Sequence, residues 1–141
     1  MAIMVTSSIL ASFAVSPAHA VTVCSDMTVT GGYGMFPMVA PTQTSDGSGY
    51  FEFDGAGRVR GHETDVFSNG SKTLSDIKGK YKIKPNCEIK MVLTYYINGT
   101  QNTIGTFEGV VVNSGSKIDT LLTGETGNTV HPAPFVLEAV Q

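Results

Sequence analysis

Gly49-Tyr-Phe-Glu-Phe-Asp-Gly-Ala-Gly-Arg-Val-Arg-Gly61 is the plainest structural signal in this sequence. Apolar and polar residues alternate up to Asp54, a glycine-rich turn follows, and the alternation resumes after Gly57. Phe51 and Phe53 therefore share one face of a strand, and the turn glycines supply the positive φ angles that a tight connection needs. The stretch predicts a β-hairpin whose second strand continues to about residue 66.

A two-faced strand follows in the segment from Ile77 to Lys84. Four lysines alternate there with less polar residues, so the lysine face meets water and the opposite face meets the core. Pro85-Asn86 then turns the chain into a further strand, about 87–97, which ends at the strong hairpin signal Asn98-Gly99.

Turn-forming residues recur every ten to fifteen residues after Cys24, without any sustained helical period. This pattern is typical of an all-β protein. The remaining strands are expected at about 28–35, 103–112, 117–123 and 135–140. About eight strands with short sequential connections favour an antiparallel up-and-down β-barrel, and the alternative is a two-sheet β-sandwich.

The first twenty residues carry no charged side chain and contain an apolar run, Ile3 to Val15, before Ala18-His19-Ala20. They predict a signal peptide (1–20) followed by a single domain (21–141) that is periplasmic or secreted in a bacterium. A short N-terminal membrane anchor is the alternative, although the run is shorter than the ~20 residues that span a bilayer.

The two cysteines of the chain, Cys24 and Cys87, predict one disulfide in such an exported domain. They lack the spacing with His62 and His131 that a zinc site would show, so we expect no metal and no cofactor. The net charge of −3 argues against nucleic acid as a partner.

Strand order places the two cysteines at the same end of a barrel, because Cys24 precedes the first strand and Cys87 opens the fifth. Their bond would close this end, which we call the floor. The connections at the opposite end, the mouth, look longer: 37–48, 68–76, 98–102 and 124–134. The sequence therefore predicts a closed floor and a loop-rimmed mouth.

The hairpin pattern Gly-x-Phe-x-Phe-Asp-Gly-x-Gly-x-Val-x-Gly, with Gly32-Tyr33-Gly34 before it and Gly79-x-Tyr81-x-Ile83-x-Pro-x-Cys87 after it, resembles a family of exported bacterial β-barrel proteins of unknown function. More loosely, the layout is similar to the calycin (lipocalin) barrels and to the allene oxide cyclase and dirigent barrels. The resemblance implies a barrel that binds or guides small apolar molecules. The chain has no Trp and so lacks the lipocalin Gly-x-Trp signature, and no catalytic residue carries over.

The expected lining of a ligand cavity combines adaptable methionines, tyrosines with a polar tip and one acid. These residues are Tyr33, Met35, Glu63, Tyr81, Met91 and Tyr95. The alternative is a barrel interior that is filled by its own side chains.

Glu63 and Asp65 continue the register of Val59 and could point into the barrel near its mouth, where paired carboxyl groups support acid–base chemistry. The alternative, which the sequence favours, is that this end of the strand is solvated. Glu108 is the next candidate acid, and His131 is expected to be a loop residue.

No catalytic or cofactor motif occurs in the sequence, so function has to be argued from architecture. The leading hypothesis is an exported barrel that binds a small, mostly apolar molecule at an open mouth. An envelope interaction protein with a filled barrel is the alternative, and a cyclase or isomerase is third. We expect a domain that is not integral to a membrane, because the strands look short and strand 87–97 breaks its alternation. Oligomeric state is not predicted.

Overall fold

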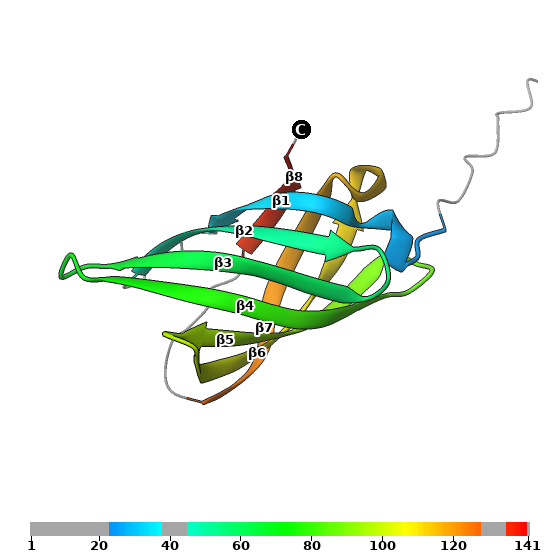
Figure 1. Cartoon of the computed structure of the whole chain (residues 1–141). Helices are drawn as coiled ribbons and strands as arrows, with labels where there is room; N and C mark the ends of the chain where they lie inside the picture. The colour runs from blue at the N-terminus through cyan, green and yellow to red at the C-terminus, as the bar shows by residue number, and fades with distance from the viewer. Residues whose placement is uncertain (1–22, 38–44, 128–134, 141) are drawn as a thin grey trace, which may run out of the picture.

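A computed structural model describes residues 23–37, 45–127 and 135–140 (Figure 1). The expected signal peptide and His131 lie outside these residues. Eight antiparallel strands form a closed barrel in sequential order, which confirms the barrel and excludes the sandwich. The strands are β1 (Thr30–Pro37), β2 (Ser45–Asp54), β3 (Arg58–Phe67), β4 (Lys72–Ile83), β5 (Glu88–Ile97), β6 (Thr100–Val112), β7 (Lys117–Gly127) and β8 (Phe135–Ala139).

Strands at the mouth begin earlier than the sequence pattern predicted. β2 begins at Ser45 and β4 at Lys72, so parts of both expected mouth connections are strand. β5 and β6 are joined only by Asn98-Gly99, where both residues have positive φ, 50° and 77°. The prediction of long connections is therefore wrong for β3–β4 and β5–β6. The other two mouth connections, 38–44 and 128–134, lie outside the described residues.

Aromatic side chains fill the middle of the barrel. Phe135 packs against Phe51 and Phe107 with ring centroids 5.7 and 4.9 Å apart, and Phe53 makes edge-on contacts with Tyr33 and Tyr81, both at 5.1 Å. Phe51 and Phe107 are completely buried. These contacts are the dense interior expected of a narrow eight-stranded barrel.

The N-terminal segment crosses the floor and is fixed there by the predicted disulfide. Cys24 and Cys87 are bonded, with their Cα atoms 5.0 Å apart. The short 3-10 helix η1 (Asp26–Thr28) follows, and Figure 1 shows this blue segment at the end of the barrel that carries the β2–β3 and β4–β5 turns. The strand order and the placement of the bond agree with the prediction from strand parity.

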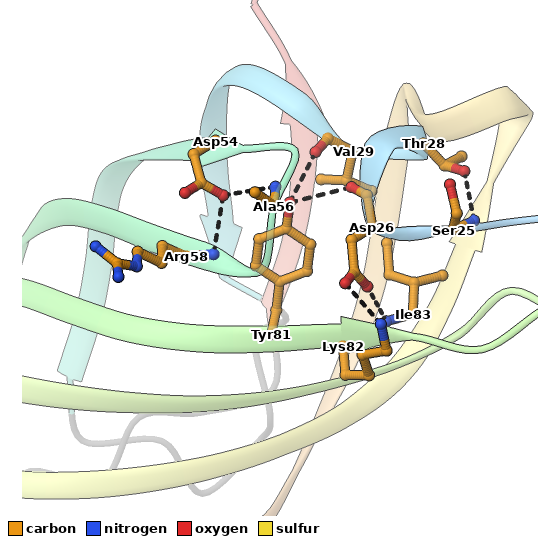
Figure 2. A network of polar contacts seen from close by, with 10 residues as sticks. All are labelled: Ser25, Asp26, Thr28, Val29, Asp54, Ala56, Arg58, Tyr81, Lys82 and Ile83. Carbon is orange, nitrogen blue, oxygen red and sulfur yellow. Dashed lines mark hydrogen bonds and ion pairs between the residues drawn. The ribbon is translucent and has the colours of Figure 1, made fainter.

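Hydrogen bonds seal this floor (Figure 2). The Tyr81 hydroxyl donates to the backbone oxygens of Asp26 and Val29 at 3.0 and 3.2 Å, and the Tyr33 hydroxyl donates to the Gly115 oxygen at 2.6 Å. The Asp26 carboxylate accepts from the Ile83 backbone N–H at 2.7 Å and from Lys82 at 2.8 Å. The buried polar groups at this end therefore have protein partners.

No helix in the described residues is both long and apolar enough to cross a membrane.

Candidate functional site: an acidic cluster inside the mouth

The alternation of β3 carries two acids into the barrel interior. Val59 faces the core, and Glu63 and Asp65 follow on the same face, only 4% and 6% exposed. Arg60 and His62, which lie between Val59 and Glu63 in sequence, are on the outer face. The expectation that this end of the strand is solvated is therefore wrong, because the strand keeps its register up to the mouth.

The two carboxyl groups meet over a glycine of the neighbouring strand. Gly47 and Gly49 on β2 are the cross-strand partners of Asp65 and Glu63 and contribute no side chain. A Cβ atom built onto Gly47 would lie 3.0 Å from Oδ1 of Asp65, 3.0 Å from Oε1 of Glu63 and 3.3 Å from Cε of Met35. The acids thus occupy space that a larger residue would take, with Met35 as an apolar neighbour.

Hydroxyl groups from β4 and β5 face the same end of the interior. Ser75 is the cross-strand partner of Glu63 and is fully buried. Tyr95, which is 1% exposed, lies close enough for the charges of Glu63, Asp65 and Glu125 to act on its phenol. We call Glu63, Asp65, Ser75 and Tyr95 the acidic cluster.

One polar atom of each member of the cluster has no hydrogen-bond partner in the described part of the chain. Among the described residues, no hydrogen bond reaches Oε2 of Glu63, Oδ2 of Asp65, Oγ of Ser75 or the hydroxyl oxygen of Tyr95. A buried polar atom without a partner costs about 1–3 kcal/mol, so native structures rarely keep several together without a reason.

Burial sets the charge state of the pair. It raises the pKa of Glu63 to about 8, and the neighbouring Asp65 carboxylate adds to the rise. Burial also raises the pKa of Asp65, while a hydrogen bond from Glu63 opposes that rise. The Glu63 carboxyl therefore keeps its proton near neutral pH and donates a hydrogen bond to Asp65, which favours the negative charge on the Asp65 carboxylate. Burial and the nearby acids raise the pKa of Tyr95, so its phenol stays protonated.

The structure brings together three of the six predicted ligand-binding residues. Met35, Glu63 and Tyr95 lie at the mouth, whereas Tyr33 and Tyr81 belong to the floor and Met91 is completely buried beside its strand partners Tyr81 and Phe107. The single predicted cavity lining is therefore divided between the two ends of the barrel. Glu108, the next candidate acid, lies on the outer face and pairs with Lys90 at 3.1 Å.

Sequence reasoning missed Ser75 and the role of Gly47. Ser75 stands two residues before Ile77 in the same inward register, so extending the alternation backwards would have found it. The polar character of the segment suggested a loop instead. No group of three or more His, Cys, Asp or Glu residues in the described part of the chain could hold a metal ion.

Comparisons with known proteins add no relative: no family model matches the chain, and neither a curated protein nor a solved structure does. The resemblance to exported bacterial barrels stays a prediction.

Proposed function

We propose that the protein is an exported barrel that binds a small, mostly apolar molecule at its mouth, with the acidic cluster holding a polar group of that molecule. The observation that carries this proposal is the set of four buried polar atoms that have no hydrogen-bond partner among the described residues, on Glu63, Asp65, Ser75 and Tyr95. A ligand that supplied their hydrogen bonds would recover part of the cost of burying them. Met35 beside the carboxyl groups gives the same region an apolar wall.

The disulfide supports the location outside the reducing cytoplasm, because such bonds persist in oxidising compartments. The filled aromatic middle limits the ligand to the mouth end, so the bound molecule is expected to be small.

Native mass spectrometry of the protein purified from its own host tests this function. The expected result is an additional mass that disappears on denaturation and is absent from the variant Glu63→Gln, Asp65→Asn. The proposal would be refuted by two results together: the protein consistently carries no additional mass, and no small molecule in a broad library shifts its thermal unfolding.

An isomerase or cyclase is the second candidate, and the proton held between Glu63 and Asp65 favours it. A protonated acid beside a carboxylate in a low-dielectric site can donate and accept a proton in one reaction. Turnover of the bound molecule into an isomer, abolished by Asp65→Asn, would establish this activity. Release of the molecule unchanged after prolonged incubation would exclude it.

An interaction protein is the third candidate, favoured by a groove of about 580 Å³ on the outer face. Val110 and Leu121 line it with exposed side chains. Pull-down from envelope extracts would recover a partner that Leu121→Lys no longer retains, and a clean monomer without a partner would count against this function.

A further inference from the structure

We propose that the polar group held by the acidic cluster is an organic cation, and specifically a primary ammonium on an apolar body. This inference rests on the proposed function and deepens it, because it names the chemical class of the ligand. It rests on three features of the cluster: its charge, its free hydrogen-bonding atoms and its lack of a cationic side chain.

The charge of the cluster has no counter-ion among the described residues. The basic residues of β3 and β4 that flank the acids in sequence all point to the outer face and are exposed; they are Arg58, Arg60, His62, Lys72, Lys78 and Lys80. No lysine or arginine in the described ranges lowers the pKa of either acid. A buried negative charge without a cation is costly, and a cationic ligand removes that cost.

The free atoms fit the hydrogen-bonding capacity of an ammonium group. A primary ammonium has three N–H donors and no acceptor. Oε2 of Glu63 and Oδ2 of Asp65 are available as acceptors, and the hydroxyl oxygen of Ser75 or Tyr95 supplies a third. The two hydroxyl groups can turn to accept, whereas a ligand carbonyl would need donors and would leave the charge uncompensated.

Other ligand classes fit the cluster less well. The negative charge of the carboxyl pair would repel an anion. A hard metal ion prefers six or more oxygen ligands, many of them carboxylates. No group of three or more His, Cys, Asp or Glu side chains among the described residues is arranged to hold a metal ion. An alkylammonium ion satisfies the charge with one group and places its apolar chain beside Met35.

Binding of a cation is expected to release protons to the buffer. The positive charge would lower the raised pKa of Glu63, so that a fraction of the protein molecules would lose the shared proton at neutral pH. Among the described residues, the titratable groups around the pair are Asp65 beside Glu63 on the same strand, Tyr95 on β5, and Glu125 on β7, whose charge acts on Tyr95. Met35 on β1, the glycines of β2 and Ser75 on β4 do not titrate in this range.

The test compares octylammonium, octanol and octanoate, which share one apolar chain and differ in the head group. Isothermal titration calorimetry of the full mature chain at neutral pH should give a Kd for octylammonium at least about tenfold lower than for octanol, with no detectable binding of octanoate. Titration in buffers of different ionisation enthalpy should also show proton release. The double variant Glu63→Gln, Asp65→Asn should lose the preference for octylammonium, whereas Glu108→Gln, which removes an exposed acid, should keep it.

The outcomes separate the inference from the proposed function. Equal or tighter binding of octanol or octanoate would refute the ammonium proposal and leave the binding function standing. Binding of none of the three would also refute the ammonium proposal, and the binding function would fall with it only if native mass spectrometry finds no additional mass. If the double variant does not fold, Gly47→Ala provides a second test, because its Cβ would intrude on both carboxyl groups while keeping their charge. We expect it to weaken octylammonium binding at least about fivefold, and unchanged binding would contradict the proposed position of the site.

Discussion

Tyr81 at the floor and Tyr95 at the mouth are both buried in the same barrel, yet only one of them has hydrogen-bond partners. The Tyr81 hydroxyl donates to two backbone oxygens, whereas no described residue pairs with the hydroxyl of Tyr95. The acids differ in the same way. Lys82 and the Ile83 N–H lower the pKa of Asp26 at the floor, whereas burial raises the pKa of Asp65 at the mouth. The buried polar groups of the floor therefore stabilise the fold, whereas those of the mouth are, under the proposed function, left for a ligand to pair.

Loss of the disulfide should have the largest effect, and it should be confined to the stability of the fold. The double variant Cys24→Ser, Cys87→Ser is expected to lower the free energy of unfolding by about 4 kcal/mol, because the bond closes a long loop in the unfolded chain. Urea unfolding measures this loss. Octylammonium affinity should change less than about twofold, and a parallel loss of binding would show that the two ends are coupled.

Glu63→Gln should remove a pH dependence that belongs to the mouth. The pKa of Glu63 is raised from 4.5 to about 8, so the folded protein holds a proton that the unfolded chain has released. The contribution of this proton to the free energy of unfolding is therefore fully present below about pH 4.5. It is lost as the pH rises to about 8, by at most about 1.4 kcal/mol per pH unit. Urea midpoints across this range should decline for the wild type and stay flatter for Glu63→Gln.

Asp26→Asn provides the control for this pH effect at the other end of the barrel. The pKa of Asp26 is lowered, so its contribution is present above its unfolded pKa of 3.8 and is lost as the pH falls through the folded value. This variant should flatten the acid limb alone. A change in the alkaline limb would contradict the separate assignment of the two acids.

The two buried tyrosines provide a matched pair of hydroxyl deletions. Tyr81→Phe should lower the free energy of unfolding by about 1–3 kcal/mol, because it leaves the backbone oxygens of Asp26 and Val29 without their donor. Tyr95→Phe removes a hydroxyl without a partner and should cost less than about 0.5 kcal/mol or stabilise the fold. Equal losses in urea unfolding would mean that the mouth hydroxyl is as well paired as the floor hydroxyl.

The smallest expected effect is that of the ion pair on the floor. Lys82 is largely exposed, so Lys82→Met should lower the free energy of unfolding by less than about 1 kcal/mol. The Ile83 N–H still holds the Asp26 carboxylate in this variant. A loss as large as that of Tyr81→Phe would show that the charge of Lys82, rather than the backbone contacts, holds the segment.

The sequence predicted the floor well and the mouth poorly, and the same physical reason explains both results. The barrel, its strand order and the Cys24–Cys87 bond follow from apolar alternation and turn residues. Both signals are clear in the strand segments near the floor. At the mouth ends of β2, β3 and β4 the inward positions include Gly47, Glu63, Asp65 and Ser75, which interrupt that alternation. The polar stretches were therefore interpreted as loops or solvated strand ends. The inward-facing residues of the candidate site are polar or lack a side chain. For this reason the apolar alternation that indicates a strand was missing from the segments that contain them.

A carbon-13 NMR titration of the isotopically labelled protein follows the carboxyl carbons of Glu63 and Asp65 and measures directly whether the two groups are buried and coupled. We expect Glu63 to titrate with a midpoint near the pKa of about 8 and Asp65 to respond to the same step, because the pair shares one proton inside the barrel. If both carboxyl groups instead titrate independently near the values of exposed acids, about 4, the acidic cluster is open to water and the proposed binding site is contradicted.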